Sequence, residues 1–180
     1  MLTPRLEEEI ASFSRELKGK LNESLLLILL IKNYDAAIES KKTRSRGFRG
    51  RKDRLLVREG LTTAVVAKEL NMNQSTVGTT VNRLMKRGLV THSKGNPIIT
   101  TDKGRIAARE QVRHHRLLEV WLTNSLGLSP DGAHEQSIKL ALISNCELIN
   151  TIDKRYDQPE RCPCGDEIPK SEICGKDLLS

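Results

Sequence analysis

The sequence contains few aromatic residues and no long apolar run. Aromatic side chains make up 3% of the 180 residues, so the core must consist mainly of Leu, Ile, Val and Ala. The longest apolar run, LLLILLI, has seven residues, whereas a membrane-spanning helix needs about 20. The N-terminus also lacks the basic start and apolar block of a secretory signal. We therefore expect a cytoplasmic protein with no membrane partner, in a compartment where free thiols and metal thiolates are more common than disulfides.

Motifs for hydrolysis and phosphoryl transfer are missing as well. No Ser-His-Asp set, glycine-rich phosphate-binding loop or pair of acid/base carboxylates stands out, so we do not expect an enzyme. A chain of this length holds one medium domain or two small ones.

The charges of the chain are segregated. The formal net charge is +7, but residues 41–116 alone contain 19 Lys and Arg against 5 Asp and Glu, and both ends are acidic. A basic middle between acidic ends indicates a polyanion-binding module. Residues 41–53, KKTRSRGFRGRKD, are expected to form a basic loop. This loop is either a disordered linker or a segment that follows a phosphate backbone, and the two roles are compatible.

The N-terminal 40 residues have the apolar spacing of helices. Leu6, Ile10, Phe13 and later leucines recur every three or four residues, which predicts a first helix that ends near residue 21. Asn22 is placed to cap a second helix that runs to about Glu39.

The segment LTTAVVAKELNMNQSTVGTTVNRLMKRG predicts two short helices joined by a tight turn. Thr62 or Thr63 is placed to cap the first helix, Asn73 or Ser75 the second, and Gly88 would end it. The segments LVTHS and PIITT then flank a Lys-Gly-Asn turn, which predicts a β-hairpin. Together these elements form a winged helix-turn-helix.

The second helix of such a motif presents its N-terminal residues to the major groove of DNA. Here those residues are small or polar, and Gln can pair with adenine. A glycine inside this helix is unfavourable, which is explained if the backbone lies close to DNA. The predicted DNA-binding residues are Asn73, Gln74, Ser75, Thr76, Gly78, Thr79, Arg83, Lys86 and, in the wing, Lys94. A winged helix that binds protein instead would fit the basic surface less well.

Two helical segments follow the wing. One carries an apolar stripe that includes Leu117, Val120 and Trp121, and AHEQSIKLALISNCELINTIDKRY is predicted to be the last helix. Little else in the chain could cover them, so they predict a homodimer, which suits a DNA reader that matches two half-sites.

The predicted fold class is therefore mainly α with a small β-hairpin, in three parts. Residues 1–100 would form the winged helix-turn-helix DNA-binding domain, with an N-terminal helical extension and the basic loop. Residues 101–156 would form a helical dimerisation and metal-binding domain, and residues 157–180 a cysteine-containing tail.

Four segments, in order, resemble the diphtheria-toxin-repressor family of iron- and manganese-dependent transcriptional regulators. They are LTTAVVAKELNMNQSTVGTTVNRLMKRGLV, TDKGRIAAREQVRHHRLLEVWL, a His within DGAHEQS, and QPERCPCGDEIP, which is similar to the family's Cys-Pro-His-Gly-x-x-Ile-Pro ending. The resemblance covers about residues 58–169. It implies a DNA-binding domain for a double-stranded operator and a helical dimerisation domain that binds metal.

The resemblance also implies one metal site. Three residues match ligands of one of the family's two metal positions, namely His115, Glu119 and His134. The first two are four apart and share a helix face, and such a set suits iron, manganese or zinc. The alternative is a surface His–Glu pair beside an unrelated His. The family's other, usually activating, site would fall on side chains that cannot bind a metal: Ile138, Ala141 and Leu142.

The four cysteines suggest a replacement for that lost site. Cys146 is expected one turn beyond Leu142 on the same helix, and Cys164 stands where the family has its tail His. If the tail folds back, Cys146, Cys162, Cys164 and Cys174 would form one four-thiolate site for an iron–sulfur cluster or a divalent metal such as Fe, Mn or Zn. The Cys-x-Cys spacing is tighter than in zinc knuckles and favours the cluster. A structural zinc, thiol–disulfide sensing by Cys162 and Cys164, and an inert tail remain alternatives.

These patterns favour a homodimeric DNA-binding regulator, such as a repressor, that responds to iron, iron–sulfur status or a divalent metal through the dimerisation domain and the cysteine tail. One alternative is a regulator that uses only the His/Glu site, with a structural zinc or an inert tail. Another, from a different class, is a cysteine-based redox or metal-transfer protein, which would not need the basic middle or the wing.

Overall fold

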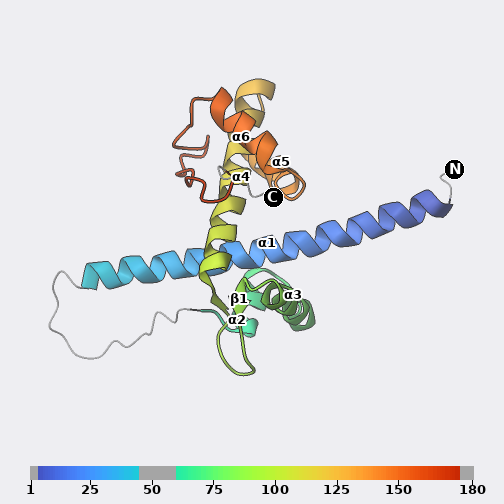
Figure 1. Ribbon diagram of the computed structural model, residues 1–180, viewed down its shortest axis with the longest axis vertical. Helices are drawn as coiled ribbons and strands as arrows, with labels where there is room; N and C mark the ends of the chain where they lie inside the picture. Colours follow the sequence, from blue (N-terminus) through green and yellow to red (C-terminus); the bar gives the residue numbers. More distant parts are fainter. Residues whose placement is uncertain (1–3, 45–59, 175–180) are drawn as a thin grey trace. The chain divides into compact units, whose positions relative to one another are not determined.

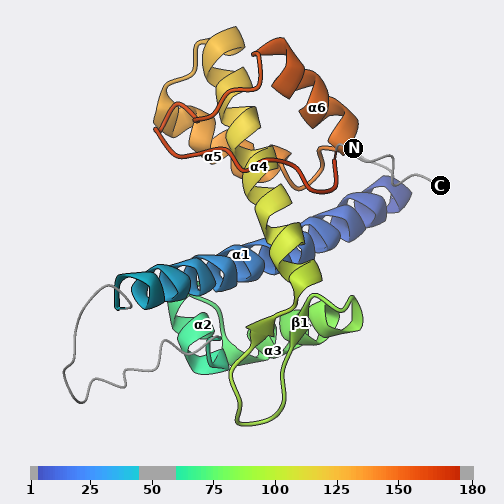
Figure 2. The same ribbon diagram turned by 60° about the vertical axis from the view of Figure 1, so that its left-hand side comes forward.

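The computed structural model describes residues 4–44 and 60–174, and the side chains of the first helix over residues 11–36. The described chain is mostly helical, with one two-stranded antiparallel sheet, and this confirms the predicted fold class. It divides into two compact units (Figures 1 and 2). One spans Leu25–Arg105, and the other combines the start of α1, up to Ser24, with the chain from Ile106 onward.

Helix α1 (Pro4–Arg44) is one continuous helix of 41 residues. The predicted break at Asn22 is therefore wrong. An Asn inside a helix costs well under about 1 kcal/mol, no proline follows it, and the next residues, Glu23 to Ile31, are mostly good helix formers. The last residues of α1 also take up the start of the predicted basic loop; residues 45–53 of that loop lie outside the described residues.

The unit Leu25–Arg105 contains the predicted winged helix. Thr62 caps α2 (Thr63–Glu69) by accepting a hydrogen bond from the Val65 amide, and Asn73 caps α3 (Gln74–Lys86) in the same way. Gly88 follows α3 with a φ of 69°, the left-handed conformation expected of a residue that ends a helix. Strands β1 (Val90–Thr91) and β2 (Ile99–Thr100) pair antiparallel and form the wing.

The core of this unit is aliphatic, as the composition requires. Its buried side chains come from α1, α2, α3 and the wing: Leu26, Leu27, Leu30, Ile31, Val66, Val77, Val81, Leu84, Leu89, Val90 and Ile98. Each helix contributes one apolar face, so the opposite face of α3 is left exposed.

Helix α4 (Asp102–Leu126) begins directly after the wing. The Thr101 hydroxyl donates to the Gly88 carbonyl oxygen, at 2.8 Å, and accepts from the Gly104 amide, at 3.0 Å. A Cβ at Gly104 would overlap the Leu89 carbonyl group. Glycine is therefore needed where α4 passes against the wing backbone.

The other unit is built on the rest of α4, with α5 (Pro130–Leu140) and α6 (Cys146–Arg155). Its core contains Leu117, Leu118, Val120, Ala141, Ile149, Ile152, Cys162 and Ile168, with Trp121 packed against it. The predicted single last helix is wrong, because a turn at residues 141–145 divides it. Asn145 causes the restart by accepting a hydrogen bond from the Leu148 amide at 3.0 Å, so that Cys146 is the first residue of a new helix.

The tail after α6 folds back over α4 (Figure 2). Arg116 on α4 donates to the Glu167 carbonyl oxygen and pairs with Asp166 at 3.0 Å. Cys162 and Ile168 are buried in the core. None of the described helices is long and apolar enough to cross a membrane.

Candidate metal centre and nucleic-acid interface

In the helical unit, two predicted metal ligands converge on one oxygen atom of the third. His115 Nε2 lies 2.9 Å from Glu119 Oε1, and His134 Nδ1, which comes from α5, lies 2.6 Å from the same oxygen. The two imidazole nitrogens are 3.2 Å apart. Glu119 is almost completely buried, while His134 is exposed at the rim. The structure therefore brings His115, Glu119 and His134 together.

A serine fixes the orientation of the His115 ring. The Ser137 hydroxyl donates to the His134 carbonyl oxygen at 2.8 Å, so its oxygen accepts from His115 Nδ1, also at 2.8 Å. With its proton on Nδ1 alone, His115 presents the Nε2 lone pair to Glu119 Oε1; with a proton on Nε2 as well, it donates a hydrogen bond to that oxygen. A neighbour that fixes the tautomer in this way is common around metal-binding histidines.

The Glu119 carboxyl is held in its ionised form. Burial by itself would raise its pKa, but hydrogen bonds with His115, His134 and Cys162 outweigh burial and lower the pKa to about 2. A buried carboxylate facing a nitrogen lone pair is an unfavourable arrangement unless a proton or a cation lies between them. Two imidazoles and one carboxylate are donors that first-row divalent metals accept.

Two tail cysteines approach the same carboxylate from another side. Glu119, Cys162 and Cys164 offer ligand atoms that lie within 4.8 Å of one another, and Cys164 Sγ is 3.9 Å from Glu119 Oε1. Partial desolvation and the Glu119 charge raise the pKa of the exposed Cys164 to about 11, and burial with a hydrogen bond to Glu119 also raises the pKa of Cys162. Both are therefore neutral thiols at neutral pH unless a cation replaces their protons.

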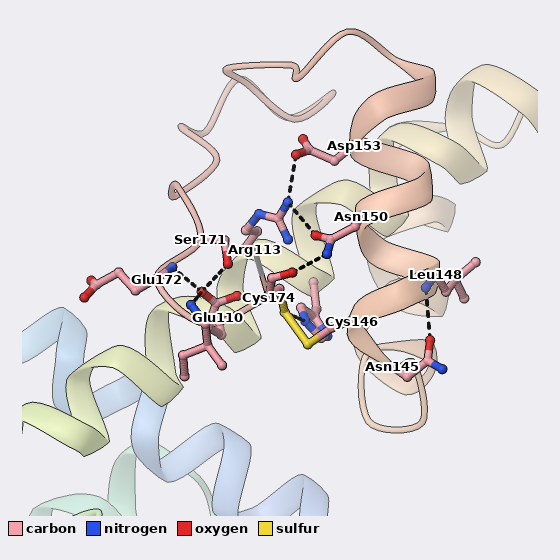
Figure 3. The surroundings of a disulfide bond; sticks show 12 residues. Glu110, Arg113, Asn145, Cys146, Leu148, Asn150, Asp153, Ser171, Glu172 and Cys174 are labelled. Carbon is pink, nitrogen blue, oxygen red and sulfur yellow. Dashed lines mark hydrogen bonds and ion pairs between the residues drawn. A yellow bond between two sulfur atoms is a disulfide. The ribbon is translucent and has the colours of Figure 1, made fainter. Parts of the chain in front are cut away.

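The other two cysteines lie elsewhere, so the predicted four-thiolate site is not formed. Cys146 and Cys174 are joined by a disulfide, which also corrects the expectation of free thiols (Figure 3). Cys162 and Cys164 of the tail lie beside Glu119, whereas Cys174 lies beside His114. These two positions on α4 are five residues apart, which is about 7.5 Å along a helix. The four sulfurs thus form two separate pairs.

Several polar residues that the sequence analysis missed hold the end of the tail. Glu110 Oε1 accepts hydrogen bonds from the Ser171 hydroxyl and from the amides of Glu172 and Ile173. Asn150 on α6 donates to the Cys174 carbonyl oxygen (Figure 3). Burial lowers the pKa of His114, partly offset by the Glu110 charge. The spacing Glu110 to His114 places both on one face of α4 and was a signal available in the sequence.

The predicted DNA-binding residues gather on α3 and the wing. Gln74, Ser75, Thr79, Arg83, Lys86 and Lys94 are exposed, whereas Thr76 and Gly78 are half-buried. Asn73 has a structural task, because its Oδ1 accepts from the Thr76 amide at 2.7 Å and from the Ser75 hydroxyl at 2.8 Å. A Cβ at Gly78 would meet nothing within 4 Å, so packing inside the unit does not explain this glycine.

Models of two known protein families match the chain, one in the winged-helix unit and one in the helical unit. Residues 101–170 match the family described as iron dependent repressor, metal binding and dimerisation domain, and residues 54–96 match the MarR family. The diphtheria toxin repressor of Corynebacterium diphtheriae is 31% identical over 122 residues, which are 67% of this chain and 54% of that protein. The chain belongs to the diphtheria toxin repressor family.

Solved structures place the fold in the same family. A manganese-dependent transcriptional repressor in complex with manganese is 31% identical, with a TM-score of 0.55 over 74% of this chain and 58% of the other. A hypothetical protein from Sulfolobus solfataricus is 25% identical, with a TM-score of 0.61 over 81% of this chain and 96% of the other. The chain spans about half the length of the curated repressors that it matches.

Proposed function

We propose that this member of the diphtheria toxin repressor family is a cytoplasmic, homodimeric transcriptional regulator, not an enzyme, whose affinity for operator DNA depends on a divalent metal. The ion is of the iron, manganese or zinc class, and His115, Glu119 and His134 bind it. Residues 1–100 serve DNA binding, residues 101–156 dimerisation and metal binding, and residues 157–180 form the tail.

The observation that carries this proposal is the convergence of two imidazole nitrogens on Glu119 Oε1. The ionised carboxylate and the oriented lone pair of His115 lie where a cation would satisfy both. A bound divalent ion supplies positive charge and fixes the directions of its ligands. The relatives whose names describe iron- and manganese-dependent repressors support the same assignment.

The tail thiols belong to this proposal as additional donors. The ligand atoms of Cys162 and Cys164 lie within 4.8 Å of that of Glu119, and thiolates favour zinc and other thiophilic ions over manganese. Ligands from α4, α5 and the tail would tie three segments of one unit together. A metal that binds one arrangement of these segments more tightly shifts the population toward it.

The DNA-binding half of the proposal places α3 in the major groove. Gln74, Thr79 and Arg83 are exposed on its outer face, and Lys86 and Lys94 are positioned for phosphates. Asn73 contributes its side-chain amide group only, since its oxygen caps the helix. The partner is double-stranded DNA with two half-sites.

The homodimer is supported by exposed apolar side chains in the helical unit. Leu126, Ile143 and Leu148 are 57%, 57% and 42% exposed. Each of these side chains offers apolar surface that a second copy of the chain could cover. Two copies paired through this unit would set the spacing of the two recognition helices.

The test measures DNA binding as a function of metal. Duplexes selected from a random pool with metal-loaded protein would be titrated with and without Fe²⁺, Mn²⁺ or Zn²⁺. His134→Ala should remove the metal dependence, because it deletes one ligand and leaves the winged helix intact. Glu135→Ala, at an exposed neighbour on α5, is the matched control and should behave as wild type. Metal-independent binding by the wild-type chain would refute the proposal.

The two alternatives have weaker support. A four-thiolate iron–sulfur cluster has no site among the described residues, because the sulfurs lie in two pairs. A cysteine-based redox protein needs an accessible thiolate, and the raised pKa of the exposed Cys164 opposes that role. Wild-type protein that binds no duplex at low salt would favour the redox alternative.

A further inference from the structure

A second group of metal-binding side chains surrounds the disulfide. His114 Nε2 lies 3.2 Å from Cys174 Sγ, and the ligand atoms of His114, Cys146 and Cys174 lie within 4.8 Å of one another. The three residues come from α4, from the first position of α6 and from the tail. They share no residue with the group around Glu119.

A disulfide alone does not account for the imidazole. His114 is buried, and its Nδ1 has no hydrogen-bond partner among the described residues. Its other nitrogen points at a sulfur atom that, once bonded to Cys146, is a poor partner for it. One imidazole nitrogen within 4.8 Å of two cysteine sulfurs is, in contrast, part of a common zinc ligand set.

Hydrogen bonds hold the end of the tail beside α4 and α6 in addition to the S–S bond. Asn150 donates to the Cys174 carbonyl oxygen, and Glu110 accepts three hydrogen bonds from residues 171–173 (Figure 3). The tail end is therefore anchored to α4 and α6 independently. Reduction of the disulfide would leave two thiols that are already close to each other and to His114.

The charges nearby are compatible with a cation. Glu110 lies one turn from His114 on α4, and its Oε2 has no partner among the described residues. Arg113 is the nearby positive group, and it is paired with Asp153 at 2.8 Å. The local positive charge is thus compensated, and one carboxylate oxygen remains to stabilise a bound cation.

We propose that His114, Cys146 and Cys174 form a redox-gated binding site for a thiophilic divalent cation of the zinc class. In the oxidised chain the two sulfurs are bonded to each other and the site is closed. A tertiary phosphine with one water opens it: the S–S bond breaks, each sulfur gains a proton and an electron, and the phosphine becomes the phosphine oxide. The cation then replaces the two thiol protons, and His114 donates its Nε2 lone pair. This site does not depend on the proposed regulatory function.

The experiment uses cobalt as the probe, because thiolate-bound Co²⁺ gives a near-ultraviolet charge-transfer absorption. The full chain with Cys162→Ser and Cys164→Ser is the background, so that the group around Glu119 offers only nitrogen and oxygen. After phosphine reduction this background should show the thiolate–cobalt band, and before reduction it should not. Adding Cys146→Ser or Cys174→Ser should abolish the band, and His114→Asn should weaken Co²⁺ binding at least about tenfold.

The remaining outcomes overturn the inference. No band in the reduced background, or a band that survives Cys146→Ser, means that the disulfide is only structural. Loss of the helical circular dichroism signal on reduction would also show that the disulfide is only structural, because the thiols are then not held together. His134→Ala in this background should leave the band unchanged, which separates this site from the one proposed for DNA regulation.

Discussion

Arg113 on α4 and Asp153 on α6 form an ion pair across 40 residues of sequence, with 2.8 Å between Nη2 and Oδ2. The Arg113 side chain is only 5% exposed. A charge at this depth needs its partner, since burying an unpaired guanidinium is costly. The pair fixes α6, and with it Cys146 and Asn150, against α4, which carries the proposed ligands His114, His115 and Glu119.

Asp153→Asn should therefore destabilise the helical unit by about 3 kcal/mol, near the low end for a broken buried pair. Trp121, which packs against the core of this unit, reports its unfolding in urea by fluorescence. The matched control is Asp166→Asn, which breaks the more exposed pair with Arg116 and should cost less than about 1 kcal/mol. Equal losses for both variants would contradict the role assigned to burial.

Gly78→Ala should stabilise the winged helix and weaken DNA binding at the same time. Alanine in a helix interior is about 0.5–1 kcal/mol better than glycine, and the added methyl group meets nothing within 4 Å. If α3 lies in the major groove, the same methyl group would press on DNA. Thermal unfolding and a duplex titration measure the two effects. A variant that is more stable and binds DNA as well as wild type would exclude a close approach at this position.

Alkylation of Cys164 in metal-free protein should be slow at pH 7 and rise steeply with pH. Its pKa is about 11, so the reactive thiolate fraction increases roughly tenfold per pH unit below that value. Glu119→Gln removes the nearby negative charge and should lower this pKa, so that alkylation becomes faster at a given pH. Mass spectrometry after iodoacetamide treatment gives the rates. An unchanged rate in Glu119→Gln would show that the carboxylate does not act on this thiol.

Lys86→Ala should weaken binding to all duplexes by a similar factor, because a phosphate contact carries no sequence information. The slope of log affinity against log salt should become shallower by about one. Lys139→Ala, at an exposed position on α5, is the control and should leave the slope unchanged. A change in sequence preference with Lys86→Ala would instead assign the lysine to base contact.

The winged helix could be predicted from sequence because its signals are local. Thr62 and Asn73 each accept a hydrogen bond from a backbone amide three residues further on, at the start of a helix. Gly88 adopts the left-handed conformation that follows a helix end. The grouping of His115 with Glu119 is also local, being one helix turn. His134 was placed with them through the family resemblance, and the structure puts its nitrogen 2.6 Å from the carboxylate.

The cysteine pairing could not be predicted because it depends on the path of the tail. The prediction treated Cys146 as the continuation of a helix that in fact ends at Leu140, so it placed this thiol near the wrong partners. Which cysteine meets which part of α4 is decided by distant contacts, such as Arg116 with Glu167 and Glu110 with Ser171. No spacing in the sequence encodes these contacts.

Two groups of side chains, a pair of histidines and a pair of cysteines, compete for the single carboxylate of Glu119. His115 and His134 approach one oxygen from α4 and α5, and Cys162 and Cys164 approach the same carboxylate from the tail. In the proposed site, an ion that prefers nitrogen would draw Glu119 toward α5, and a thiophilic ion would draw it toward the tail. The hardness of the ion would then determine which of two chain segments is tied to α4, so that two metals of equal affinity would leave the helical unit in different states.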